Sequence, residues 1–225
     1  MCFSAIVSFN AAAGLSLLGI ITIRRTTSNR EVLLASFPCL FAIQQTFEGL
    51  VWMGKSNSYF SGIEPIGTYG FLLFATLLWL VLSPLSVYAL EQDPKRSRLL
   101  LGLTFGGLLF GLYLFSWIIY VGVEPQTFSG NLFYDLRFIP GYEVSKYLYL
   151  AIISLPFVIA HSYSLKLFGG LIMLSFIASQ LFFQVTLVSV WCFFAAILSG
   201  FLYFVMKDLS SKIKLTSRSS GTNIG

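Results

Sequence analysis

The chain has 225 residues, of which 56% are hydrophobic and 10% are charged, and its mean hydropathy is +0.83. A soluble domain has about a quarter of its residues charged, so the composition excludes an ordinary soluble protein. In lipid, unpaired backbone groups restrict spanning segments to helices or a closed barrel. The apolar runs, for example residues 71–80 and 167–174, lack the alternation of barrel strands, which favours helices.

Seven runs are long enough to cross a bilayer, for which a helix needs about 20 apolar residues. In chain order the predicted spans are residues 4–23, 32–53, 67–90, 99–123, 144–161, 167–184 and 186–206. The predicted fold is therefore all-α, a bundle of seven transmembrane helices over residues 1–207. Residues 208–225 are predicted to form a basic, disordered cytoplasmic tail.

The distribution of basic residues predicts the orientation of the bundle. Of the 14 lysines and arginines, all but Lys55, Arg137 and Lys146 fall on one side of the seven predicted spans. The positive-inside rule then places the N-terminus outside and the C-terminus in the cytoplasm. The net charge of +5 is thus a topology signal, and we expect the protein to bind no nucleic acid.

The glycines of the fourth predicted span and the long outer loop also carry predictions. Gly102 and Gly106, like Gly107 and Gly111, are four residues apart, a spacing that lets helix backbones approach closely. We expect them to pack within the bundle, with a dimer interface as the alternative. The long outer loop, residues 124–143, is either a lid over the outer mouth or a partner-docking surface.

Polar side chains inside lipid are costly, which makes each of them a candidate functional residue. Gln44, Gln45 and Glu48 share a broad face of the second span, because they are three and four residues apart, and Trp52 lies one turn further on. The predicted topology brings polar residues of other spans to the same depth. The candidate ligand-binding residues in this outer-leaflet site are Gln44, Gln45, Trp52, Gln180, Ser189 and Trp191.

Cys2, Glu48 and Cys192 form a candidate metal site at the same level. Removal of Met1 would leave Cys2 with a free α-amine beside its thiol, and these two groups can chelate one ion. With the Cys192 thiolate and the Glu48 carboxylate, the ligands suit zinc or copper. The alternatives are a disulfide between Cys2 and Cys192 on the oxidising outer side, or two small buried residues.

Glu48 is the candidate acid/base residue. In the structural alternative its carboxyl is neutral or pairs with Lys146 and holds helices together. Whether the protein is an enzyme stays open, since Ser189 and Cys192 are the only plausible nucleophiles and no paired base is visible. The hypotheses are therefore a membrane protein that binds a metal ion or small ligand, or a non-catalytic subunit of a larger membrane complex.

Three segments carry a resemblance to a known family: Met1 to Ala5, the stretch from Phe41 to Trp52 with Gln-Gln-x-x-Glu-Gly-x-x-Trp, and Ser189 to Ala196 with Ser-Val-Trp-Cys-Phe-Phe-Ala-Ala. In these the chain resembles a family of uncharacterised bacterial membrane proteins. The resemblance implies a polytopic fold but no activity. We therefore expect a multi-pass protein of the bacterial inner (plasma) membrane or an internal membrane, in contact with the lipid bilayer and either homo-oligomeric or part of a larger complex.

Overall fold

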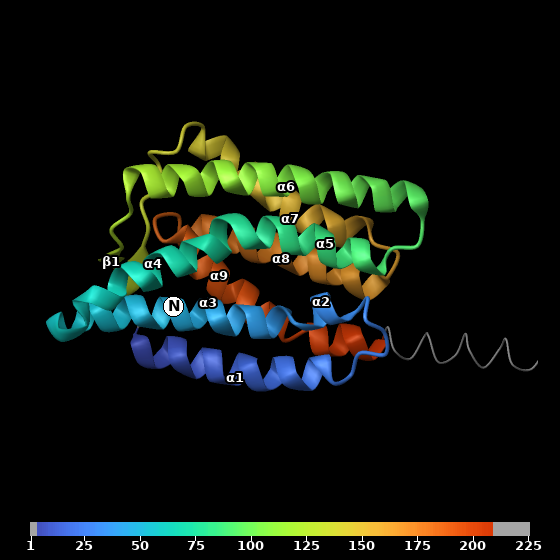
Figure 1. Cartoon of the computed structure of the whole chain (residues 1–225), viewed down its shortest axis with the longest axis horizontal. Helices are drawn as coiled ribbons and strands as arrows, with labels where there is room; N and C mark the ends of the chain where they lie inside the picture. The colour runs from blue at the N-terminus through green and yellow to red at the C-terminus, as the bar shows by residue number, and fades with distance from the viewer. Residues whose placement is uncertain (1–3, 209–225) are drawn as a thin grey trace, which may run out of the picture.

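The computed structural model describes residues 4–208, and its helices lie along one long axis (Figure 1). Cys2 and the predicted tail from residue 209 onward lie outside the described residues. The elements in chain order are α1 (Ala5–Ile23), α2 (Val32–Ala35), α3 (Phe37–Ser56), the 3-10 helix η1 (Ser58–Ile63), α4 (Glu64–Leu73), the π-helix η2 (Phe74–Leu78), α5 (Trp79–Leu90), α6 (Pro94–Val121), β1 (Gln126–Phe128), β2 (Asn131–Phe133), α7 (Tyr142–Ile159), α8 (Tyr163–Phe182) and α9 (Leu187–Ser199).

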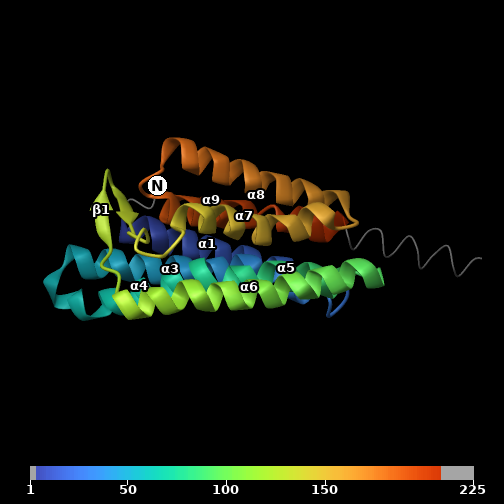
Figure 2. The same ribbon diagram turned by 90° about the horizontal axis from the view of Figure 1, so that it is seen from above.

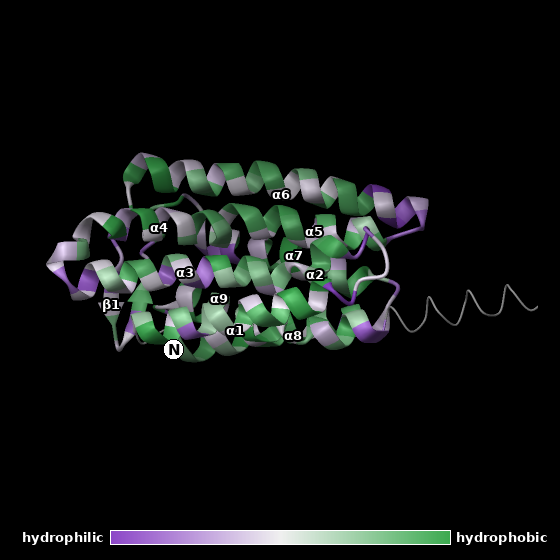
Figure 3. Ribbon diagram, turned by 60° about the horizontal axis from the view of Figure 1, so that its bottom comes forward, coloured by the Kyte–Doolittle hydropathy of each residue, from purple (hydrophilic) through white to green (hydrophobic). Residues whose placement is uncertain are grey.

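Within residues 4–208, six helical segments are long and apolar enough to cross a membrane. They are Ala5–Ile23, Ser58–Leu90, Pro94–Val121, Tyr142–Ile159, Tyr163–Phe182 and Leu187–Asp208. Apolar residues cover the length of the bundle, and hydrophilic residues gather toward its two ends (Figure 3). The chain is therefore a helical, multi-pass membrane protein.

The predicted second span, residues 32–53, is not among these six segments, because its helix is less apolar than they are. Its main helix, α3, has 20 residues, about 30 Å at 1.5 Å per residue, and lies alongside the other long helices (Figure 1). Its buried residues include Gln44, Gln45 and Glu48, which lower its hydropathy. A seventh span thus stays a prediction.

Several predicted boundaries differ from the observed ones. The second span, expected over residues 32–53, is divided at Ser36 into α2 and α3. Pro38 lies in the first turn of α3, where backbone N–H groups have no helical partner, so the N–H that proline lacks is not needed. The third, expected over 67–90, is part of a helical segment that begins at Ser58 and contains the π-helix η2. The seventh begins at Leu187, and its helical segment continues to Asp208.

Helices α1 and α3 pack closely and antiparallel (Figure 1). Gly19 lies against Cys39 near one end, and Gly49 lies against Phe9 near the other. A Cβ at Gly49 would lie 2.8 Å from the Phe9 ring, closer than carbon atoms can approach without a shift. These two contacts set the register of α3 against α1. They place Glu48 at a level about 8 Å along α1 from its first residue, at 1.5 Å per residue.

The two glycine pairs of α6 have different surroundings. A Cβ at Gly107 would collide with the backbone carbonyl of Leu80, and one at Gly111 would lie 2.7 Å from Leu77. This pair therefore packs α6 against α5 and η2, as expected. A Cβ at Gly102 or Gly106 would meet no other part of the described chain within 4 Å, so the expected packing within the bundle is wrong for this pair.

The long outer loop begins with a β-hairpin at one end of the bundle (Figure 2). Strands β1 and β2 are antiparallel and join through Ser129 and Gly130, both with positive φ, as the two-residue turns of hairpins require. Beyond the hairpin the loop packs inward. Tyr134 is buried and stacks on Phe71 of α4 at 5.1 Å between ring centroids, so the loop covers this end of the helices.

Candidate functional site

Glu48 of α3 and Ser189 of α9 form a buried hydrogen bond between helices. Both residues are fully inaccessible to solvent, and the Ser189 hydroxyl donates to the Glu48 carboxylate (Oγ to Oε1, 2.5 Å). The two residues are 141 positions apart in the sequence. Their meeting in the half of the bundle that carries the hairpin agrees with the depth expected from the topology.

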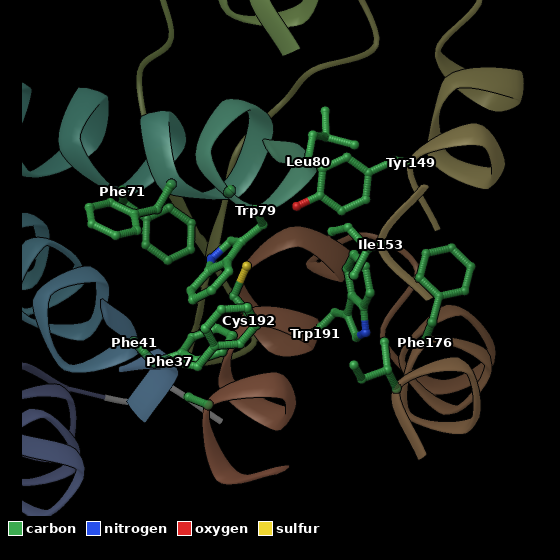
Figure 4. Close-up of a cluster of buried hydrophobic side chains, with 14 of the residues drawn as sticks. Phe37, Phe41, Phe71, Trp79, Leu80, Tyr149, Ile153, Phe176, Trp191 and Cys192 are labelled. Carbon is green, nitrogen blue, oxygen red and sulfur yellow. The ribbon is translucent and has the colours of Figure 1, made fainter. Parts of the chain in front are cut away.

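Gln44 and Cys192 extend this contact toward the centre of the bundle. The Cys192 thiol lies beside the Gln44 amide and the Glu48 carboxylate. Gln44 Oε1 accepts a hydrogen bond of 2.7 Å from the Trp79 indole nitrogen. In Figure 4 the Cys192 sulfur points toward Trp79, and the Tyr149 hydroxyl points toward the same space. The structure thus brings Gln44, Glu48, Ser189 and Cys192 together.

Trp79 was not predicted as a site residue. It follows the π-helix η2 directly, and its ring stacks on Phe41 at 4.0 Å between centroids. Isolated π-turns occur often at functional sites, but nothing in the apolar sequence of this segment indicates one. The one available signal was a tryptophan in mid-span, since tryptophan is otherwise enriched at the membrane interfaces.

Several buried polar atoms on α1 and α3 have no hydrogen-bond partner among residues 4–208. They are Ser8 Oγ, Gln44 Nε2, both amide atoms of Gln45, and Trp52 Nε1. Each such atom costs about 1–3 kcal/mol when it is left without a partner. We call Ser8, Gln44, Gln45, Glu48, Trp52, Ser189 and Cys192 the polar cluster.

Two of the predicted ligand-binding residues lie away from the polar cluster. The Trp191 indole nitrogen donates to Ser175 Oγ of α8 at 3.2 Å, and its ring packs edge-on against Tyr149 and Phe176. Gln180 lines a separate cavity near the hairpin. Gln180 lies on α8, which contacts α7 and α9 more closely than α3, so its place in the predicted site stays a prediction.

Among the described residues, Lys146 forms an ion pair with a carboxylate of its own helix and not the proposed one with Glu48. Lys146 forms its ion pair with Glu143, three residues before it on α7, with 2.5 Å between Nζ and Oε2. Lys146 is 8% exposed, whereas Glu143 is 72% exposed. Lys146 thus has a local partner at the hairpin end of α7, and Glu48 has Ser189.

Three neighbouring cavities lie between the hairpin and the interior of the bundle. The inner cavity is lined by residues that include Phe41, Trp79, Tyr149, Trp191 and Cys192. The middle cavity shares Tyr149, Trp191 and Cys192 with it. The outer cavity shares Leu136, Tyr142, Lys146 and Leu187 with the middle one.

The outer cavity is the polar one of the three. Its lining includes Asp135 and Arg137 from the loop, which form an ion pair with 2.8 Å between Oδ2 and Nη2. This hydrogen-bonded pairing lowers the pKa of the Asp135 carboxyl below its ordinary value. Both side chains are partly exposed, so solvent screens the pair and its contribution to stability is small.

The candidate metal site is incomplete within the part of the chain that the structure describes. No three His, Cys, Asp or Glu residues come together there. Glu48 and Cys192 are neighbours, but Cys2 lies outside the described residues. Cys39 and Cys192 form no disulfide with another described residue, and Cys39 lies against Gly19, away from the polar cluster. Zinc or copper binding and a disulfide with Cys2 both stay predictions.

The comparisons with known proteins identify a family but no activity. No curated protein and no solved structure matches the chain. A family of unknown function (DUF6629) matches residues 1–216, which is nearly the whole length. The chain belongs to this family of unknown function.

Proposed function

We propose that this membrane protein binds a small polar ligand or a metal ion at the polar cluster, in the outer half of the bundle. The observation that carries the proposal is the set of buried atoms of Ser8, Gln44, Gln45 and Trp52 without partners among the described residues. Native structures leave few such groups, and several on two closely packed helices, α1 and α3, support a polar occupant.

The chemistry of the cluster limits what this occupant can be. Gln44, Gln45 and Trp52 offer N–H donors without partners, which suit acceptor atoms of a ligand. Glu48 and Cys192 offer a carboxyl oxygen and a sulfur, which suit zinc or copper. Because two protein ligands seldom hold such an ion, the metal version needs Cys2 as a third.

Metal analysis and native mass spectrometry of the purified full chain test the proposal. We expect a bound mass or stoichiometric metal in the wild type, and its loss in Glu48→Gln and Gln45→Leu. Cys39→Ser, which changes a thiol outside the polar cluster, is the matched control and should retain the occupant.

The Cys2→Ser variant separates the two versions of the proposal. Loss of metal in this variant supports the metal version, whereas stoichiometric metal that is unaffected by it contradicts Cys2 as a ligand. A wild-type protein that carries neither metal nor bound small molecule, in mild detergent and in nanodiscs, would refute the binding site.

A second candidate function is a non-catalytic subunit of a larger membrane complex. It is favoured by Gly102 and Gly106, which leave open space on α6 at a spacing suited to close helix contact. Purification in mild detergent tests it. A stable hetero-complex that Gly102→Leu dissociates supports this function, and a lone monomer with a bound ligand supports the first.

A further inference from the structure

The outer cavity, at the hairpin end of the bundle, takes no part in the function proposed for the polar cluster. Its volume of about 440 Å³ falls within the range of ligand pockets, about 300–1,000 Å³. Its walls come from both strands of the hairpin, the loop that follows, α7, α8 and the start of α9. The largely exposed side chains of Arg137 and Glu143 line it, so a water-soluble ligand can enter from this end.

The charged side chains that line the outer cavity balance one another. Asp135 and Glu143 carry negative charges, and Arg137 and Lys146 carry positive charges. Asp135 pairs with Arg137, and Glu143 pairs with Lys146. A cation or an anion in the cavity would add a charge that the lining leaves unbalanced, and burying an unbalanced charge is costly. A zwitterion adds no net charge, so the lining favours a ligand with one charge of each sign.

Two polar groups of the lining have hydrogen-bonding capacity that the described residues do not use. The buried Oε1 atom of Gln180 is an acceptor without a partner among residues 4–208. Lys146 has only 8% of its side chain exposed, and its ion pair with Glu143 leaves further N–H donors of the ammonium group available. A complementary ligand therefore donates hydrogen bonds on one side and accepts them on the other.

The packing of α7 against α8 places the acceptors of the two helices at one level. Tyr147 of α7 contacts Phe176 of α8, with 6.2 Å between ring centroids. The two helices are consecutive and antiparallel (Figure 2). Gln180 lies one turn beyond Phe176, and Glu143 lies one turn before Tyr147. The Gln180 amide oxygen and the Glu143 carboxylate are therefore placed to accept hydrogen bonds from one donor group.

The remaining wall of the outer cavity is mostly aromatic and apolar. It is formed by Phe128, Phe133, Tyr134, Tyr142, Val185 and Leu187. Aromatic rings bury large areas of an apolar group that packs against them. The wall thus suits a ligand that carries an apolar side chain beside its charged groups.

We propose that the outer cavity binds a small zwitterion, with its ammonium group between Gln180 and Glu143, its anionic group at Lys146 and an apolar side chain against the aromatic wall. An α-amino acid with an aromatic side chain has this chemistry. The ethanolamine phosphate head group of a phospholipid carries the same pair of charges. The proposal does not rest on the function proposed for the polar cluster, because no residue of that cluster lines this cavity.

Isothermal titration of the purified full chain with phenylalanine and its analogues tests the proposal. Phenethylamine lacks the carboxylate and hydrocinnamate lacks the ammonium group, and we expect each to bind about tenfold or more weakly than phenylalanine, because hydrogen bonds to charged groups are the stronger ones. Glycerophosphoethanolamine distinguishes the two sources: tighter binding than phenylalanine assigns the site to a lipid head group, and weaker binding assigns it to an amino acid. Binding of neither zwitterion, or equal binding of phenylalanine and an analogue, would overturn the proposal.

Variants of the two recognition residues separate specific contacts from general damage to the fold. Gln180→Leu should weaken binding of phenylalanine and phenethylamine but not of hydrocinnamate. Lys146→Met should weaken binding of phenylalanine and hydrocinnamate but not of phenethylamine. The matched control is Lys55→Met, which removes the same charge from a lysine paired with Glu64 in another cavity and should change none of the three.

The selectivity of these variants decides the outcome. A loss of binding that is equal for all three compounds in both variants would show a structural effect and contradict the assigned contacts. If Lys146→Met does not fold, Gln180→Leu and the analogue series on the wild type still test the ammonium contact and the need for both charges.

Discussion

Replacement of Ser189 by alanine removes the hydroxyl that donates a hydrogen bond to Glu48 Oε1. The Ser189 hydroxyl lies 2.5 Å from that carboxylate oxygen, and both residues are fully buried. The variant leaves Glu48 in place with one hydrogen bond fewer. We therefore expect the loss to appear as destabilisation of the contact between α3 and α9.

The magnitude follows from hydrogen bonds measured in membrane proteins. Interhelical hydrogen bonds there average about 0.6 kcal/mol and reach about 1.7 kcal/mol. A carboxylate acceptor makes a hydrogen bond roughly twice as strong as a neutral one. Ser189→Ala should therefore lower the free energy of unfolding by about 1–2 kcal/mol.

Reversible unfolding in mixed micelles, with increasing SDS, measures this free energy. The matched control is Ser199→Ala in the same helix, because Ser199 is equally buried but donates to the Ala196 carbonyl of its own helix. We expect the control to lower stability by less than Ser189→Ala does, because its hydroxyl bonds within its own helix.

Coupling between the partners gives the sharper measurement. In a double-mutant cycle with Glu48→Gln, the two changes should be non-additive, since residues in direct contact share an interaction energy. If Ser189→Ala costs no more than Ser199→Ala and its effect adds to that of Glu48→Gln, then the contact between these residues does not stabilise the fold.

Three further predictions use the same purified protein. Trp79→Phe keeps an aromatic ring but loses the hydrogen bond of the indole nitrogen and part of the buried ring volume, and should destabilise by about 1–3 kcal/mol in the same micelle titration. Gly107→Ala should destabilise by about 1–3 kcal/mol because its methyl group overpacks a helix contact, whereas Gly102→Ala, which meets open space, should be neutral or stabilising. Arg137→Gln should raise the pKa of Asp135, which the arginine lowers, and an NMR titration of the carboxyl measures this shift. Because a lowered carboxyl pKa stabilises the fold at neutral pH, this contribution to stability disappears as the pH falls through the folded pKa. An unchanged titration of Asp135 in the variant would contradict the pairing.

Part of the candidate site could be predicted from the sequence. The shared face of Gln44, Gln45 and Glu48 follows from helix periodicity, and the meeting of Glu48 with Ser189 and Cys192 follows from a topology that brings their helix segments to one depth. The contact of Trp79 with Gln44 could not be predicted, because it depends on the π-helix before Trp79. The contribution of Gln180 stays a prediction, because depth alone does not say which helices are neighbours.

The sequence by itself determined the class of protein, since composition and hydropathy act through every residue and need no knowledge of contacts. It also determined most of the helices, because hydrophobic runs and helix periodicity are local properties. The tertiary structure decided which polar side chains meet and where space remains. Contacts such as Gly49 with Phe9 and Gly107 with Leu80 set the register of neighbouring helices. Register and rotation arise from packing between residues far apart in the chain, and for that reason the cluster and the cavities appear only in the folded bundle.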